Sequence, residues 1–430
     1  MTRRERGERL LATAPLRFPA ACYAMNRTIH NLISLAAMAL SLCAQTLAQQ
    51  TQQHATSTEP AKVALLELAA AAFERMPMDP HGKNRGRGQM EVVDACFEAG
   101  LLDLGLRIGD SILDWRRGLA HARYALACEQ QGVTCDIERH LEIARREVDA
   151  LRASDNEQAW RAERILAAVA RVRLARGETA KFADVSQHVT AAEGSGIQAD
   201  AAMRMPAEAF DRWLEQADAV LGSQAFDPIQ ATLQSCAELY GRFYADADKR
   251  AQLERRVVSG YDKLPLQVRL KLLVAIGRAA AEAGDAAKTL EICGHADRVL
   301  AKANWRPEDR VSALADVAVL FWRGGDARRA KEQIDAAAVL YAEHCSSILD
   351  IYRSAPLRAL AEAAAATSDP SRAMEFWRRA VEAGVANPNS RPRADDFAAT
   401  CVSFVRAKVA PDATLWERLQ EIARGLGSPW

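Results

Sequence analysis

A turn that recurs between two stretches of helical pattern is the feature that most constrains the fold of this chain. The three clearest copies are Gly284-Asp285, Gly325-Asp326 and Ser368-Asp369, and their aspartates are 41 and 43 residues apart. In the first two copies a glycine ends one helix in left-handed backbone, and in all three an aspartate caps the next helix. This spacing is typical of stacked, antiparallel helical hairpins.

The rest of the chain supports an all-α architecture. Weaker copies of the turn occur near Gly132, Gly177 and Asp246. From Ala61 onward the apolar residues recur at intervals of three and four, with no sustained alternation of period two. Alanine is abundant while β-branched and aromatic residues are few, which favours helix over strand. We therefore expect an α-solenoid, a superhelix of stacked antiparallel hairpins.

Small and large residues also keep fixed places around the turns. Phe321 precedes the turn at Gly325, with Ala318 three residues earlier, and Ala330 and Ala337 follow on one helix face. In the copy around Ser368, Ala373 and Ala380 take the same two places. The pattern resembles the tetratricopeptide repeat, although the units are longer than the usual 34 or so residues of that family. The resemblance covers roughly residues 264–384 and implies close helix crossings at the small positions.

The N-terminal segment has the layout of a secretory signal. From Met25 the sequence reads MNRTIHNLISLAAMALSLCAQTLAQQ, a short basic start, an apolar stretch and small residues before Gln49. The apolar stretch, residues 32–42, is too short to span a bilayer. We expect an exported protein, periplasmic or secreted; the alternative is an amphipathic or buried helix.

These patterns predict the following organisation. Residues 1–24 are an upstream extension outside the mature protein, 25–48 a signal peptide, 49–60 a flexible linker, 61–190 an N-terminal hairpin array, 191–226 an irregular joint, and 227–430 a tetratricopeptide-like array with a terminal cap. Within the joint, residues 191–200 are expected to be a loop and residues 207–221 a helix. The cap is a last pair of helices divided at Ala410-Pro411-Asp412.

The sequence carries no common catalytic signature. It lacks the HExxH zinc motif, the GxSxG elbow, the GxxxxGK phosphate loop and any CxxC pair. Lysine plus arginine equals aspartate plus glutamate, 56 each, so no basic excess indicates a nucleic-acid partner. We expect neither a cofactor nor a transmembrane span in the mature chain.

Three cysteines and one basic segment are candidates for a disulfide, a metal site or a binding contact. Cys128 and Cys135 flank the turn at Gly132, where an oxidising compartment permits a disulfide; the alternative is that both pack as small apolar residues. His344-Cys345 has no further ligands at metal spacing. The basic segment HGKNRGRG, residues 81–88, is expected to be a loop, either a solvated connector or a contact for an anionic partner.

These observations favour a non-catalytic role. We expect a scaffold that binds a protein or peptide through a concave helical surface, by analogy with the repeat family. Arg278, Asp316 and Arg323 are the candidate groove residues. The alternatives are an all-helical enzyme or enzyme subunit of the cell envelope, and a purely structural envelope protein. A closed array with acidic residues converging in a deep pocket would favour the enzyme.

Overall fold

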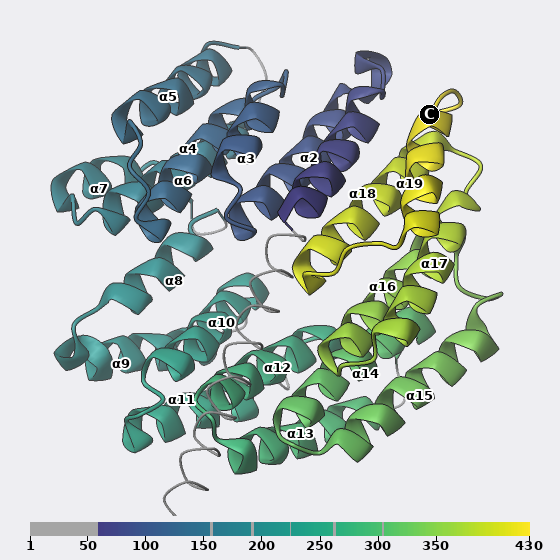
Figure 1. Cartoon of the computed structure of the whole chain (residues 1–430). Helices are drawn as coiled ribbons and strands as arrows, with labels where there is room; N and C mark the ends of the chain where they lie inside the picture. Colours follow the sequence, from purple (N-terminus) through teal and green to yellow (C-terminus); the bar gives the residue numbers. More distant parts are fainter. Residues whose placement is uncertain (1–58, 155–157, 191–192, 224, 261–263, 303–304) are drawn as a thin grey trace, which may run out of the picture. The chain divides into compact units, whose positions relative to one another are not determined.

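The computed structural model describes residues 59–154, 158–190, 193–223, 225–260, 264–302 and 305–430 (Figure 1). The chain divides into two units, residues 1–59 and Pro60–Trp430, and the helices α2 to α19 belong to the second. Every regular element in the described residues is helical, which confirms the predicted all-α fold. The expected signal peptide and nearly all of the expected linker lie outside the described residues. No helix of the described part has the length and apolar character that a membrane crossing requires.

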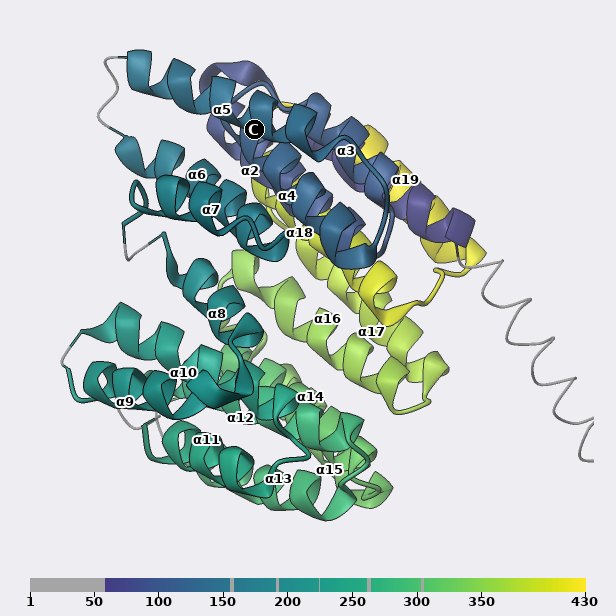
Figure 2. The ribbon, with the colours of Figure 1, turned by 90° about the vertical axis from the view of Figure 1, so that its left-hand side faces the viewer.

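The helices of Pro60–Trp430 form two rows, as Figures 1 and 2 show. A helix over residues 59–74 comes first. The inner row then consists of α2 (Met78–Glu98), α4 (Arg116–Gln131), α6 (Ala159–Ala175), α8 (Ser195–Arg204), α10 (Phe226–Arg242), α12 (Leu266–Glu282), α14 (Pro307–Arg323), α16 (Asp350–Ala366) and α18 (Ser390–Ala407). The outer row consists of α3 (Leu102–Asp110), α5 (Ile137–Ala153), α7 (Thr179–Ser186), η1 (Ala207–Ala209) with α9 (Phe210–Leu221), α11 (Ala247–Gly260), α13 (Ala286–Leu300), α15 (Ala327–His344), α17 (Pro370–Val385) and α19 (Ala413–Gly425).

The inner row closes on itself. Each inner helix contacts the next, and α18 contacts α2, so the last hairpin packs against the first (Figure 1). Arg406 of α18 donates a hydrogen bond to Glu98 of α2 at 3.0 Å, and Arg87 forms an ion pair with Asp395 at 3.5 Å. The guanidinium of Arg75 also donates to the backbone oxygen of Leu426 at 3.2 Å. Because the ends cover each other, neither end of the array exposes an uncapped hairpin face.

The recurring turns have the backbone that the sequence indicates. Gly284 and Gly325 have φ of +76° and +87°, in the left-handed region that glycine adopts without strain. Ser368 takes the same conformation, with φ of +62°. Asp285 and Asp326 each accept a hydrogen bond from the backbone N–H three residues later, both at 2.9 Å. Each turn therefore ends one helix and caps the next within a few residues.

The small positions of the repeat lie at helix crossings. Ala318, Ala330, Ala337, Ala373 and Ala380 are all fully buried. Phe321, before the turn, is also buried, and the guanidinium of Arg329 lies 4.2 Å from the centre of its ring. Side chains this small let paired helices approach closely while the larger neighbours fill the space between hairpins.

The predicted loop over residues 191–200 is wrong for residues 195–200, because α8 begins at Ser195. Ser195 and Gly196 are poor helix formers, but Ile197 and Ala202 of the same helix are buried. The side chains of Arg171 and Asp200 also join α6 to α8, with N–O distances of 2.7 and 3.2 Å. Tertiary contacts therefore override weak helix propensity here. The helix predicted over residues 207–221 and the last helical pair are present as η1 with α9, and as α18 with α19.

The predicted basic loop over residues 81–88 is also wrong, because these residues form the first turns of α2. Two of its three glycines, Gly86 and Gly88, are buried and serve packing. A Cβ atom on Gly88 would lie 2.2 Å from the ring of Phe73, and one on Gly86 would lie 2.6 Å from a carboxylate oxygen of Asp114. The helix over residues 59–74 approaches α2 closely only because Gly88 has no side chain.

Replacing Gly88 tests this packing. Gly88→Ala is expected to destabilise the protein by about 1–3 kcal/mol, because the added methyl group forces the buried Phe73 ring to move. Gly294→Ala in α13 is the matched control: a Cβ there meets nothing within 4 Å, so the change should be neutral or stabilise by up to about 1 kcal/mol. Thermal and denaturant unfolding measure both, and equal effects of the two variants would contradict the packing role of Gly88.

Candidate functional site: a polar hollow in the inner row

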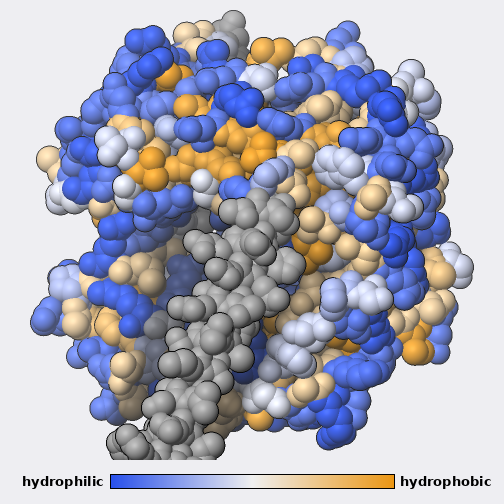
Figure 3. Space-filling view, in the orientation of Figure 1, coloured by the Kyte–Doolittle hydropathy of each residue, from blue (hydrophilic) through white to orange (hydrophobic). Residues whose placement is uncertain are grey.

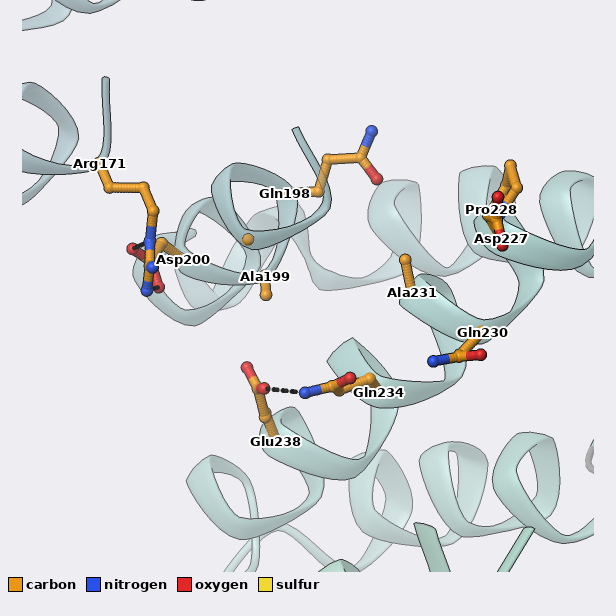
Figure 4. A pocket seen from close by; sticks show the side chains of 11 residues that line it. Arg171, Gln198, Ala199, Asp200, Asp227, Pro228, Gln230, Ala231, Gln234 and Glu238 are labelled. Carbon is orange, nitrogen blue, oxygen red and sulfur yellow. Dashed lines mark hydrogen bonds and ion pairs between the residues drawn. The ribbon is translucent and has the colours of Figure 1, made fainter. Parts of the chain in front are cut away.

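A hollow of about 440 Å³ lies where the hairpin rhythm is interrupted, between α6, α8 and α10. Helix α8 is only 10 residues long, whereas α6 and α10 each have 17. The short helix leaves the space between its neighbours only partly filled. The side chains that line the hollow and that Figure 4 labels are Arg171, Gln198, Ala199, Asp200, Asp227, Pro228, Gln230, Ala231, Gln234 and Glu238.

Amide side chains dominate the polar lining. Gln230, Gln234 and Glu238 follow one another at intervals of four along α10, so they share one helix face. Gln198 contributes from α8 (Figure 4). The side-chain amides of Gln198 and Gln230 make no hydrogen bond within the described part of the chain, whereas the amide of Gln234 donates to Glu238 at 3.5 Å. Each free amide offers a donor and an acceptor to a ligand.

The charges around the hollow are partly neutralised. Arg171 and Asp200 form a bidentate pair at one side of it (Figure 4). Glu238 is exposed to water, but the walls of the hollow lie close to its carboxylate, and this desolvation raises its pKa above the ordinary value. The hollow is therefore polar, and Asp227 and Glu238 are the two carboxyl groups of its lining that the Arg171–Asp200 pair does not neutralise.

A second cavity, of about 370 Å³, lies between α8, α9 and α10. Its lining is more apolar and includes Trp213, Ala217 and Val220. Gln198 borders both this cavity and the hollow. Helix α8 is thus the element that separates the two spaces.

Large apolar side chains are exposed at one end of the inner helices. Leu113, before α4, and Leu349, before α16, are 67% and 63% exposed. Others at the same end of their helices are Met78, Trp160, Phe226, Ile351 and Tyr352. Phe226 immediately precedes Asp227 and Pro228 of the hollow. On the face drawn in Figure 3, apolar residues gather in the upper middle, and the periphery is mostly hydrophilic.

The predicted groove residues lie elsewhere on the inner row. Arg278 of α12 and Asp316 of α14 face each other with an N–O distance of 3.7 Å, and both are about half exposed. Arg323, at the end of α14, lies 3.9 Å from Glu282 of α12. The structure thus brings Arg278 and Asp316 together, whereas Arg323 pairs with a different residue of α12, and none of the three lines the hollow.

The surroundings raise the pKa values of two carboxyl groups, Asp316 of this pair and Glu362 on α16. Asp316 is about half exposed, but the surrounding protein still desolvates its carboxylate and raises its pKa above the usual value, against the opposing effect of Arg278. Burial likewise raises the pKa of Glu362 on α16, although a hydrogen bond with Ser403 acts in the other direction. The hydroxyl of Ser403 itself accepts a hydrogen bond from the indole of the buried Trp377 at 2.9 Å. Neither carboxyl group borders the hollow.

Comparison with known proteins gives fold-level similarity alone. The sequence matches no protein-family model and no curated protein. One similar solved structure is a variant of a putative kinesin light chain from Podosopora anserina with nearly identical TPR-like repeats, 14% identical, covering 63% of this chain and 96% of its own, with a TM-score of 0.25. Another is a circular tandem repeat protein with novel repeat topology and enhanced subunit contact surfaces, 17% identical, covering 87% and 96%, also with a TM-score of 0.25.

The hairpins themselves provide the stronger observation. They combine a left-handed turn, a capping aspartate and buried alanines at the crossings. The hairpins of this chain are tetratricopeptide-like. The assignment rests on these residues of the chain, because superpositions with such low TM-scores are too loose to support it.

The sequence patterns do not identify the residues of the hollow as a site. Gln198, Asp200 and their neighbours fall in the segment predicted to be a loop, so they were assigned no helix face. One signal was present: Gln230, Gln234 and Glu238 repeat at four-residue intervals, which places three polar groups on one face of a helix. That signal identifies a polar face but not the gap beside it, which depends on the length of α8.

The cysteines and histidines offer no metal site in the described residues. No group of three His, Cys, Asp or Glu side chains there is arranged to hold a metal ion. Cys128 and Cys135 are free thiols, the first buried and the second half-buried. Cys345, next to His344, is also free.

A buried histidine pair connects α4 and α5. The Nδ1 atoms of His121 and His140 are 2.9 Å apart, and His121 Nε2 lies 3.1 Å from a carboxylate oxygen of Asp110 on α3. If His121 donates through Nε2 to Asp110, its Nδ1 accepts from His140 Nδ1, so both rings are satisfied when neutral. Burial lowers the pKa of both histidines, with smaller effects from Arg117 and Arg139 in the same direction.

The histidine pair predicts acid sensitivity. The unfolded chain protonates both rings as the pH falls through about 6.5, whereas the folded chain resists protonation until lower pH. Stability present above about pH 6.5 is therefore lost as the pH falls, by at most about 1.4 kcal/mol per pH unit for each histidine. This loss of stability is checked by measuring the unfolding midpoints of the wild-type chain and of His140→Asn between pH 7.5 and about 5.

His140→Asn should lose less stability than the wild type as the pH falls. The control, His188→Asn, changes an exposed residue near the end of α7 and should leave the pH dependence unchanged. Comparing variants is necessary because the raised pKa values of Asp316 and Glu362 act in the opposite direction. Parallel curves for the wild type and His140→Asn would rule out this role of the pair.

Proposed function

We propose that Pro60–Trp430 is a non-catalytic scaffold that binds an extended protein or peptide segment on its inner row, with the hollow between α6, α8 and α10 as the main contact. The observation that carries the proposal is the amide lining. Gln198, Gln230 and Gln234 each present an N–H donor and a C=O acceptor, which complement the backbone groups of an extended peptide.

The character of the hollow supports a peptide over a small molecule. Pockets for small ligands are mostly apolar and enclosed, with few polar groups. This hollow is lined mainly by polar side chains. The exposed ring of Phe226 beside it supplies an apolar contact for one side chain of the bound segment.

The enzyme alternative has one observation in its favour. The inner row is closed, and Asp316 and Glu362 are carboxyl groups with raised pKa values, a property that general acids share. Against this, Asp316 faces Arg278 and Glu362 is hydrogen-bonded to Ser403, and neither borders the hollow. Asp316→Asn distinguishes the two functions, because the scaffold retains peptide binding in this variant whereas an enzyme that uses this carboxyl loses turnover.

The amide lining predicts the effect of its removal. A phage-displayed library of random linear peptides, selected on the immobilised protein, should yield peptides that bind the hollow. The double variant Gln230→Ala/Gln234→Ala should bind such a peptide about tenfold more weakly, because it loses hydrogen bonds to the peptide backbone. Fluorescence polarisation of the labelled peptide measures the dissociation constants.

Gln187→Ala, at an exposed glutamine at the end of α7, is the matched control and should bind like the wild type. The proposal fails if the selection enriches no linear peptide, or if the enriched peptide binds the double variant and the wild type equally well.

We also propose that the protein is exported through the signal at residues 25–48, and that its partner lies in the same compartment. The support is the basic start, the short apolar stretch and the small residues before Gln49. N-terminal sequencing of the protein from an envelope fraction should begin near Gln49. A protein recovered from the cytosol with residues 25–48 intact would contradict export.

A further inference from the structure

The turn between α4 and α5 brings two cysteines together. Helix α4 ends at Gly132, whose φ of +67° is left-handed, and the N–H of Val133 donates back to the carbonyl of Cys128 at 2.9 Å. The chain then reverses through Cys135, and Asp136 caps α5. As a result the two cysteines lie on either side of one short turn, and Cys128 is close enough to affect the pKa of the Cys135 thiol. Two cysteines that flank such a turn are placed to form a disulfide.

The surroundings hold this pair in place. The side chain of Cys128 is fully buried, and it lies close enough to Tyr124 to raise the pKa of the phenol. The ring of Tyr124 packs on His140 of α5, with ring centres 4.6 Å apart. Cys128 is thus fixed from α4 and, through Tyr124, from α5. Cys135 is half-buried at the turn, so its side chain is less constrained than that of Cys128.

We propose that Cys128 and Cys135 form an intramolecular disulfide that staples the turn between α4 and α5. Two S–H bonds break and one S–S bond forms. The two protons and two electrons pass to a small-molecule or protein disulfide, such as oxidised glutathione, which is reduced to two thiols. This proposal does not depend on peptide binding, and the test below supplies the oxidant itself, so it does not depend on export either.

The pairing is specific to these two cysteines among the described residues. The other five, Cys96, Cys236, Cys293, Cys345 and Cys401, come from α2, α10, α13, the end of α15 and α18. Four of them are fully buried in the core, and burial raises the pKa of the Cys96, Cys236 and Cys293 thiols to about 12. The thiol pKa does not distinguish these cysteines from Cys135; what distinguishes the Cys128–Cys135 pair is that none of the other five faces a second described cysteine across a turn.

The same physics determines when the bond forms. Burial raises the pKa of the Cys135 thiol to about 12, so thiolate is scarce once the hairpin has packed. Bond formation is therefore fast while the hairpin is still loose and slow in the folded, reduced protein. The reduced chain, once folded, should resist oxidation.

The first test maps the thiols. The full chain is refolded in a glutathione redox buffer, denatured without reductant, alkylated, digested and analysed by mass spectrometry. The expected product is one cross-linked peptide that joins Cys128 to Cys135 and is lighter by two hydrogen atoms than the reduced pair. The other five cysteines of the second unit should be alkylated. Alkylated Cys128 and Cys135, or pairing of either one with another cysteine, would overturn the proposal.

The second test measures the staple. Reduction of the oxidised wild-type protein should lower its melting temperature and speed amide exchange across residues 132–136, because the unfolded chain loses a constraint. Cys135→Ser should show neither response to reductant, whereas Cys345→Ser, at another half-buried cysteine, should respond like the wild type. A wild-type protein that contains the bond but melts identically before and after reduction would disprove the stapling role.

Discussion

The contact between α18 and α2 is the constraint on which the arrangement of Pro60–Trp430 depends. A stack of hairpins buries apolar surface between neighbours and leaves one unpaired face at each end. Here those two faces cover each other, through the contact of α18 with α2 and through pairs such as Arg406 with Glu98. Exposed ion pairs of this kind contribute little energy, so the buried apolar surface stabilises the closure and the charges select its register.

Partial desolvation explains the electrostatics of the inner row. Carboxyl groups such as Asp316 face other parts of the protein as well as water, and this partial desolvation raises their pKa values. Asp316 is about half exposed and yet poorly solvated. The buried histidine pair on α4 and α5 shows the same effect with the opposite sign, because imidazole loses its charge when it is desolvated.

Local chemistry made much of the fold predictable. A glycine followed by an aspartate, with alanines at fixed distances, determines where helices end, begin and cross, and those signals lie within about ten residues of each other. The errors have a different origin. The glycines of residues 81–88 predict a loop, yet the segment is helical, and Gly88 is a glycine because the ring of Phe73 on another helix leaves no room for a side chain. Helix α8 forms because Ile197 and Asp200 find partners on neighbouring helices. Closure and the hollow depend on contacts distant in sequence, which no local pattern encodes.

Helix α8 has a mechanical consequence for the closed row. Elsewhere an inner helix is backed by the outer helix of its own hairpin, whereas behind α8 there is a cavity of about 370 Å³ and in front of it the hollow. The array is therefore thinnest at this point, and few packed atoms resist a displacement of α8. A closed row of helices deforms most easily where its wall is weakest, so α8 is the inner helix whose displacement the packing resists least.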